Sequence, residues 1–273
     1  MSLFVSSLNS GSNGNCYYIG SEQDAVLIDA GISSRETEKR LKRQALSMKK
    51  VKAIFITHEH SDHIAGLYKL AKRHQVPVYM TSETLRESRI EPSRIQVRSF
   101  VPHEPIPIGA LTVTPFPILH DARDPHGFQV RYRDVAVGVF TDLGKVTPAV
   151  HKYFAECHAA FLESNYDEEM LKTGGYPMEL QERIRGDRGH LSNLQALECF
   201  LTYRPSFMTH LFLAHLSENN NTPERVQELF DGVKGRTDVV IASRYRETGV
   251  YQIGGDKPGK WNAVDEASQL SLF

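Results

Sequence analysis

Cysteine, net charge and long apolar runs are all scarce in this sequence of 273 residues. The three cysteines, Cys16, Cys157 and Cys199, stand in no metal-binding or redox spacing, and their odd number argues against a disulfide framework. We expect them to be buried thiols in a reducing cytoplasm. No apolar run approaches the roughly 20 residues that span a bilayer, and the first residues lack the basic-then-apolar pattern of a signal peptide. The expected protein is therefore cytoplasmic and does not contact a membrane.

The net charge of −1 gives no general indication of a nucleic-acid-binding protein. A surface that binds nucleic acid must therefore be local, and the basic residues at 35–52 and 183–188 are candidates. Such groups more often form the solvated face of a helix. The hydrophobic content of 40% supports a substantial core, in one large domain or two small ones.

Short apolar runs rich in β-branched residues recur along the chain and predict strands. The expected strands are 3–8, 16–19, 25–29, 51–57, 76–80, 95–100, 111–117, 127–133, 135–141, 159–163, 207–214, 239–242 and 248–253. Helices are expected at 33–45 and 193–202, and from Thr222, where a capping residue precedes a proline. Many strands with helices between them indicate sheets covered by helices. We expect one domain at 1–253 and a flexible tail at 254–273, where the composition becomes polar.

Residues 57–63, Thr-His-Glu-His-Ser-Asp-His, carry the strongest functional signal. They follow an apolar strand and precede a segment with helical spacing, so they lie on a strand-to-helix loop. His58 and His60 point the same way from a strand end and can chelate one ion, whereas Asp62 and His63, turned by the loop, can hold a second. Imidazole with carboxylate suits zinc, and also manganese or iron. A solvated loop that is histidine-rich by chance would not be expected to place four ligand-type residues in this order.

Three further ligand-type residues stand at the ends of apolar strands. His120, Asp142 and His215 each follow such a run. A lone histidine there is usually a polar cap, and a lone aspartate before Leu-Gly is usually part of a turn. Metals held in pairs lie roughly 3.5–4 Å apart and need more ligands than one loop supplies. Together with the loop, the three residues complete two coordination spheres.

These residues resemble the pattern of the metallo-β-lactamase-fold hydrolases, which is His-x-His-x-Asp-His followed by distant His, Asp and His. The resemblance extends from about Ser7 to the strand after residue 239. It implies an α/β (α+β) fold, a four-layer αββα sandwich with the site at one edge of its sheets. The ligands it implies are His58, His60 and His120 for metal one, Asp62, His63 and His215 for metal two, and Asp142 as a bridge.

A closer likeness is to the YycJ/WalJ-like and PhnP-like branch of this superfamily. The segments that carry it are 10–15, 57–66, 120–125, 162–167, 189–193 and 214–220. In a comparison with the related ribonuclease Z family, Glu163 aligns as a carboxylate that orients a histidine, and His190 as that histidine. His190 could instead be a polar cap at the start of a helix. The glycine-rich loop at 10–15 could cradle a phosphate or be only a tight turn.

The resemblance implies a dinuclear metal-dependent phosphodiesterase, and we expect a DNA nuclease of exonuclease-like type. A metal-activated hydroxide would attack phosphorus, Asp62 would orient it or accept its proton, and His190, braced by Glu163, would protonate the leaving alkoxide. Alternatives are a small-molecule (cyclic) phosphodiesterase, another metallo-hydrolase, or a regulatory protein linked to two-component signalling. The complete ligand set favours an enzyme. The sequence leaves open which metal is native, whether the substrate is DNA, RNA or a small phosphodiester, whether cleavage is exo- or endonucleolytic and with which polarity, and what the oligomeric state is.

The final residues resemble the peptide by which bacterial replication and repair proteins bind the sliding clamp. Gln269 would supply the hydrogen-bonding amide, and Leu270, Leu272 and Phe273 the apolar anchors. Alternatively, these side chains pack back on their own domain. Clamp binding would bring the enzyme to DNA without a broadly basic surface.

Overall fold

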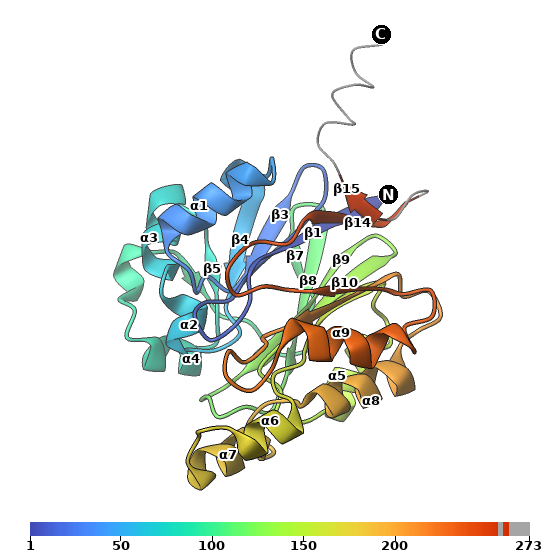
Figure 1. The fold of residues 1–273 in the computed structure, drawn as a ribbon. Helices are drawn as coiled ribbons and strands as arrows, with labels where there is room; N and C mark the ends of the chain where they lie inside the picture. The colour runs from blue at the N-terminus through green and yellow to red at the C-terminus, as the bar shows by residue number, and fades with distance from the viewer. Residues whose placement is uncertain (256–258, 262–273) are drawn as a thin grey trace.

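The computed structural model describes residues 1–255 and 259–261. Two sheets stack face to face, and helices cover the outer face of each (Figure 1). This arrangement confirms the predicted four-layer αββα sandwich. Within the described residues, no helix has both the length and the apolar character needed to cross a bilayer.

The first sheet has the strand order β15-β14-β1-β2-β3-β4-β5-β6. Its strands are β1 (Ser2–Asn9), β2 (Cys16–Gly20), β3 (Ala25–Ile28), β4 (Val51–Phe55), β5 (Val78–Tyr79), β6 (Val97–Arg98), β14 (Val250–Gly254) and β15 (Gly259–Trp261). The helices beside it are α1 (Ser34–Arg43), α2 (Ser61–Ile64), α3 (Leu67–His74) and α4 (Ser82–Ser88), with 3₁₀ turns at Met48–Lys50 and Pro92–Arg94. The strands β3, β4 and β5 run parallel, so their carboxyl ends lie at one edge.

The second sheet has the strand order β13-β12-β11-β10-β9-β8-β7. Its strands are β7 (Ile106–Ile108), β8 (Leu111–Pro117), β9 (His126–Tyr132), β10 (Val135–Phe140), β11 (Ala159–Glu163), β12 (His210–Ala214) and β13 (Asp238–Ile241). The helices that follow its strands are α5 (Pro148–Phe154), α6 (Glu168–Thr173), α7 (Met178–Arg185), α8 (Asn193–Tyr203) and α9 (Pro223–Asp231). The strands β10 to β13 are parallel, and β8 and β10 both run antiparallel to β9, so β8 shares their direction.

Continuous apolar runs form these strands because both faces of each sheet are buried. Along β12, Phe212 and Ala214 face the core between the sheets, whereas Leu211 and Leu213 face the core under the helices. The same alternation divides β4, where Phe55 enters the inter-sheet core and its neighbours the core beneath α1 and α3. The sequence of these strands therefore shows no alternation of apolar and polar residues, and it is the continuous apolar run that predicts each strand.

The segment expected as a tail contains a strand of the domain. Residues 259–261 form β15, which pairs with β14 through Val250 opposite Trp261. The first sheet therefore extends beyond the expected boundary at residue 254. The clamp-binding peptide proposed for Gln269, Leu270, Leu272 and Phe273 lies outside the described residues.

Candidate metal centre

The predicted ligands converge where parallel strands end. His58 follows β4, and His120 follows β8 after a short loop. Glu163 is the last residue of β11, and His215 comes directly after β12. Because these strands share a direction within each sheet, their carboxyl ends bring residues separated by more than 150 positions to one edge of the sandwich.

Three residues that follow strands have an unusual backbone conformation. Asp142 and His215 have φ angles of 58° and 57°, and Asp29 after β3 has 61°. This left-handed region is uncommon for residues with a side chain and costs on the order of 1–3 kcal/mol at each position. The conformation turns the chain sharply at the end of the strand. Two of the three, Asp142 and His215, line the cavity of the centre, so the conformation places ligand-type side chains there.

The three side chains expected for metal one lie together. The ligand atoms of His58, His60 and His120 are all within 4.8 Å of one another. His58 Nε2 and His60 Nδ1 face each other at 3.0 Å. His120 donates from Nδ1 to the carbonyl oxygen of Gly189 at 3.0 Å, which leaves its Nε2 toward the cavity.

The side chains expected for metal two form a second group, and Asp142 stands between the groups. In the second group, Asp62 Oδ2 is 3.4 Å from His63 Nε2 and 3.6 Å from His215 Nε2. Asp142 lies 3.3 Å from His63 Nε2 through Oδ2 and 3.7 Å from His120 Nε2 through Oδ1. The carboxylate that was expected to bridge therefore reaches one histidine from each group.

The chemistry of this cluster fits divalent cations. Asp142 Oδ2 and His215 Nε2 are buried, and neither has a hydrogen-bond partner among the described residues. Buried polar atoms are rarely left without partners. Burial lowers the pKa of His58 and of His120 below the ordinary value for histidine, which favours the neutral imidazole that a metal requires. Imidazole nitrogens and carboxylate oxygens that face one another without hydrogen-bond partners are ligand atoms that zinc, manganese and iron accept.

A buried carboxylate that the sequence analysis did not identify fixes the orientation of His63. Asp29 Oδ2 accepts a hydrogen bond from His63 Nδ1 at 2.7 Å, and Asp29 Oδ1 accepts from the Thr57 amide at 2.9 Å. Because the proton of His63 is held on Nδ1, the lone pair of Nε2 remains free to bind a metal ion. The sequence did contain a signal for Asp29, because this carboxylate directly follows an apolar run, and the same kind of signal identified Asp142.

The glycine-rich loop at 10–15 packs against the metal-binding loop. The Asn15 amide donates to the carbonyl oxygen of Asp62 at 2.7 Å, and Asn15 Nδ2 lies 3.2 Å from Asp62 Oδ2. The Gly31 amide donates to the Asn15 carbonyl oxygen. A Cβ atom at Gly31 would lie only 1.7 Å from the Asp62 carbonyl oxygen, so glycine is required there. The loop therefore positions Asp62, and Ser12 within it lines the cavity.

Glu163 is fully buried and orients two histidines, one more than expected. Its Oε1 accepts from His190 Nδ1 at 2.8 Å and from His215 Nδ1 at 3.0 Å. Its Oε2 accepts from the amides of Leu143 and Leu191 at 2.7 and 3.2 Å. A carboxylate has about four acceptor positions, and here all four are used. Glu163 is therefore an orienting residue, although it also lies within reach of Asp142, His190 and His215 as a fourth ligand-type group.

His190 lies at the wall of the same cavity, beside both ligand groups. Its ring is 5.1 Å from that of His120 and 5.4 Å from that of His215, measured between centroids. Burial opposes its charged form, but the neighbouring Glu163 carboxylate raises the pKa of His190 above the usual value. Since Glu163 holds Nδ1, the nitrogen left to exchange a proton is Nε2.

The cavity of the centre has a volume of about 350 Å³ and opens between the metal loop and α7. The predicted residues that line it are His60, Asp62, His120, Asp142, His190 and His215. Its other lining includes Tyr176, Leu180 and Ile184, which the sequence analysis did not identify. A larger cavity of about 820 Å³ adjoins it, and Ser217 lines both.

Comparison with known proteins gives sequence relatives across most of the chain. A family described as the beta-lactamase superfamily domain matches residues 24–215. Exodeoxyribonuclease YycJ of Bacillus anthracis is 35% identical over 227 residues, 82% of this chain and 86% of the relative. Exodeoxyribonuclease WalJ of Streptococcus pneumoniae is 30% identical over 222 residues, 80% of this chain and 82% of the relative.

Solved structures share the fold at lower identity. YhfI of Bacillus subtilis, a metallo-β-lactamase fold protein, has a TM-score of 0.70 at 16% identity, covering 92% of this chain and 100% of that one. A diphosphatase of the PhnP family has a TM-score of 0.66 at 18% identity, covering 93% and 98%. The chain belongs to the β-lactamase superfamily, in the branch of YycJ and WalJ, and is a metal-dependent hydrolase of the metallo-β-lactamase fold.

Proposed function

We propose that this hydrolase is a dinuclear phosphodiesterase of the cytoplasm that degrades DNA as an exonuclease. The observation that carries the proposal is the pair of Glu163 and His190 beside the ligand cluster, joined at 2.8 Å. The alkoxide that leaves a phosphodiester needs a proton, and this pair can deliver one. The two relatives named as exodeoxyribonucleases, which match 82% and 80% of the chain, support DNA as the substrate.

The proposed ligands are those of the two geometric groups. His58, His60 and His120 would hold one ion, Asp62, His63 and His215 the other, and Asp142 both. Zinc or manganese is the proposed occupant, with iron as a further choice, because imidazole and carboxylate accept all three. When bound, such ions lower the pKa of a water molecule and neutralise charge on the phosphoryl oxygens.

The chain's own residues supply proton transfers at two positions. His190 would give the proton of Nε2 to the departing oxygen and keep its Nδ1 hydrogen bond to Glu163 throughout. Asp62, which lines the cavity and is held by Asn15, would orient the nucleophile or accept its proton. Because Glu163 is saturated with hydrogen bonds, it keeps the imidazole of His190 in one orientation during both steps.

The adjoining cavity supports a polymeric substrate over a small cyclic phosphodiester. Arg244 lines it, and within the described part of the chain its buried Nε and Nη1 atoms have no hydrogen-bond partner. Its Nη2 lies 3.3 Å from the exposed Glu218 carboxylate. Because phosphate oxygens are preferred partners of a guanidinium, a strand that leaves the metal centre past Ser217 would meet this group.

The test is hydrolysis of labelled single-stranded and duplex DNA, RNA, a cyclic dinucleotide and bis-p-nitrophenyl phosphate. Chelated protein would be restored with zinc, manganese or iron in turn. We expect chelator-sensitive release of nucleotides from DNA ends. Failure to cut DNA with any of the three metals, while a cyclic dinucleotide is cut, would establish the alternative function.

A leaving-group comparison tests the role of His190. His190→Ala should retain its metal content and lose about 10²–10⁴-fold in activity on DNA, because an alkoxide needs protonation. Its activity on bis-p-nitrophenyl phosphate should fall far less, because p-nitrophenolate leaves without a proton. The matched control is His151→Ala, which alters an exposed histidine on α5. Equal losses on both substrates would contradict the assigned role.

Clamp binding by 269–273 stays a prediction, to be tested with a peptide of residues 262–273.

A further inference from the structure

Arg244 belongs to the segment 242–249, between β13 and β14, and lines the larger cavity beside the metal centre. Its side chain is only 13% accessible. Among the described residues, no group accepts a hydrogen bond from its Nε or Nη1 atom, although both atoms are buried. A guanidinium is a planar fork of N–H donors, and buried polar groups are rarely left without partners. Arg244 therefore has unused capacity to bind an anion.

The carboxylate of Glu218 covers the outer edge of this guanidinium. Glu218 Oε2 lies 3.3 Å from Arg244 Nη2, and Oε1 accepts a hydrogen bond from the Tyr245 hydroxyl at 2.9 Å. The Tyr245 ring lies beside the guanidinium, with its centroid 5.9 Å from Arg244 Cζ. We call these three residues the Arg244 latch. The Glu218 side chain is 53% accessible, and exposed ion pairs are weak, so an anion with better geometry can replace this carboxylate.

The Arg244 latch is tied to the metal centre through the glycine-rich loop. Ser10 Oγ accepts a hydrogen bond from the His215 amide at 2.8 Å, and the Ser10 amide donates to the Ser243 carbonyl oxygen at 3.1 Å. Asn13 Nδ2 donates to the carbonyl oxygen of Arg244 at 2.8 Å. One loop therefore holds a proposed metal ligand on one side and the backbone of Arg244 on the other. A ligand that spans both positions meets a fixed separation.

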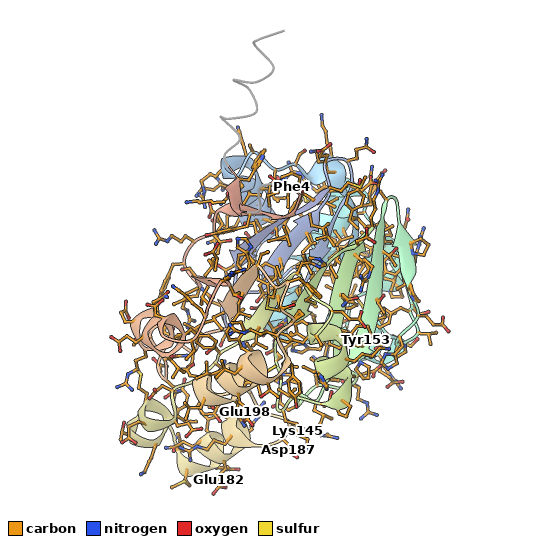
Figure 2. The ribbon with its side chains drawn as sticks, turned by 90° about the vertical axis from the view of Figure 1, so that its right-hand side faces the viewer. Phe4, Lys145, Tyr153, Glu182, Asp187 and Glu198 are labelled. Carbon is orange, nitrogen blue, oxygen red and sulfur yellow. The ribbon has the colours of Figure 1, made fainter. Side chains whose placement is uncertain are left out.

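Cations on the α7 side of the metal centre already have carboxylate partners. Arg183 donates from Nε to Asp121 Oδ2 at 2.6 Å. Lys145 forms an ion pair with Asp187, and the two lie together in the lower part of Figure 2. An anion on that side would have to break one of these pairs. The side toward the Arg244 latch is therefore better suited to a second anionic group of a ligand.

The two cavities together indicate the chemistry of the ligand. Side chains suited to divalent ions line the smaller cavity, the Arg244 latch lines the larger one, and Ser217 lines both. The other charged side chains that line the larger cavity are exposed or already bonded, namely Arg246, Lys260, Glu224 and Glu247. A ligand that serves both cavities must carry anionic groups at separated points along one chain. The phosphates of a nucleic-acid strand repeat in this way.

We infer that Arg244 binds a non-scissile phosphate of the substrate strand, and that this phosphate displaces Glu218 when it enters. The inference rests on the proposed nuclease function and adds to it a second phosphate site and a carboxylate that competes for that site. A phosphate accepts parallel hydrogen bonds from a guanidinium, whereas Glu218 leaves Nε and Nη1 without a partner. Because the contact is to the backbone, it positions the strand and carries no base specificity.

The experiment pairs a change at Arg244 with the neutralisation of single phosphates in DNA. Oligonucleotides would carry one uncharged methylphosphonate, placed in turn at each linkage near either end, or would lack the terminal phosphate. For Arg244→Gln we expect kcat/KM for the first cleavage of unmodified DNA to fall about 10- to 100-fold, the effect of one hydrogen bond to a charged group. At one position, neutralisation should cost the wild type a similar factor and the variant little, because both changes remove the same contact. That position identifies the ligand as the strand end or an inner linkage.

Glu218→Gln tests the displacement. Glutamine keeps the shape and can still accept from the Tyr245 hydroxyl, but it has no charge with which to compete against a phosphate. We expect KM on DNA to fall about 1.5- to 5-fold, the magnitude of one exposed ion pair. A loss of activity in Glu218→Gln comparable with that in Arg244→Gln would show that the pair is structural and would overturn the inference.

Controls separate a lost contact from a damaged fold. Arg236→Gln changes an exposed arginine before β13 that lines neither cavity, and should leave kcat/KM unchanged. Arg244→Lys keeps the charge without the planar fork and should recover part of the activity. Methyl p-nitrophenyl phosphate has no second phosphate, so the activity of Arg244→Gln on this ester should fall far less than its activity on DNA.

The outcomes distinguish the two proposals. If the wild type cuts DNA but each neutral phosphate costs Arg244→Gln as much as it costs the wild type, Arg244 does not bind a phosphate and the inference alone is wrong. Equal losses of Arg244→Gln on DNA and on methyl p-nitrophenyl phosphate would also overturn it. If the wild type cuts no DNA with any restored metal, the nuclease proposal fails and the inference fails with it.

Discussion

Replacement of Asp29 with asparagine tests whether a residue that touches no substrate controls the metal centre. Asp29 is fully buried, and its two oxygens serve His63 Nδ1 at 2.7 Å and the amide and hydroxyl of Thr57 at 2.9–3.0 Å. Asparagine has nearly the same shape but only one acceptor. If its oxygen keeps the Thr57 amide, its NH₂ faces His63 and moves the imidazole proton to Nε2. If it is flipped, the Thr57 amide loses its partner.

The magnitude follows from the hydrogen bonds that are lost. One buried hydrogen bond to a charged group contributes about 1.5–3 kcal/mol. We therefore expect Asp29→Asn to lower the free energy of unfolding by about 2 kcal/mol, and the Tm by about 4–8 °C for a chain of this size. In addition, a proton on Nε2 blocks the nitrogen that faces Asp62 and Asp142. Substitution of such supporting residues weakens metal binding about 10–100-fold.

Metal affinity would be measured by competition with a chelator, and stability by thermal unfolding with and without metal. The matched control is Asp134→Asn, in the exposed turn between β9 and β10. We expect the Asp29 variant to lose most of the stabilisation that metal gives the wild type. Wild-type affinity for two ions per chain in Asp29→Asn would refute the reasoning.

Three further predictions concern the ligands, the core and the surface. Asp142→Ala removes the carboxylate between the ligand groups and should lose at least one ion by elemental analysis, and full metal content with normal activity would contradict the scheme. Phe161→Ala empties a fully buried position between the sheets and should lower the free energy of unfolding in urea by about 3–5 kcal/mol, so a loss below about 1 kcal/mol would be inconsistent with this packing. Burial raises the pKa of Glu247, but the hydrogen bond and charge of Arg43 outweigh it and hold this pKa below its usual value. The pair therefore stabilises the fold above the ordinary carboxyl pKa of about 4.3, and this contribution is lost as the pH falls through the lower pKa of the folded state. Between about pH 6 and about pH 3, Glu247→Gln should therefore lose less stability than the wild type does.

The strands and the ligand loop could be predicted from the sequence because their signals are local. Sheets buried on both faces give continuous apolar runs, and all the expected strands have a counterpart in the described sheets. The metal loop places four ligand-type residues within six positions. His120, Asp142 and His215 could be predicted because each stands within three residues of the end of a strand, where parallel topology gathers side chains at one edge.

The rest of the site depends on contacts between distant segments. The short helices α6 and α7 were not expected, because with few apolar residues their strongest signal is the pair Leu180 and Ile184, which could belong to any solvated helix. Nothing in the sequence shows that this pair faces a metal centre. The second hydrogen bond of Glu163, to His215, likewise depends on the pairing of β11 with β12. The expected boundary at 254 reflected composition, whereas β15 forms through backbone pairing, which composition does not reveal.

The pairing of β1 with β14 has a consequence for how the chain can be rearranged. Ser2 lies opposite Gly254 in the register of these strands, so the start of β1 and the end of β14 are immediate neighbours (Figure 1). In a variant without β15, a short linker could join them, and new termini could be opened in the exposed turn at 133–134. Such a circular permutant would start with the half that bears Asp142, Glu163 and His215 and finish with the half that bears the histidine-rich loop and His120. Ribosomal synthesis in that reversed order should still yield the same assembled fold.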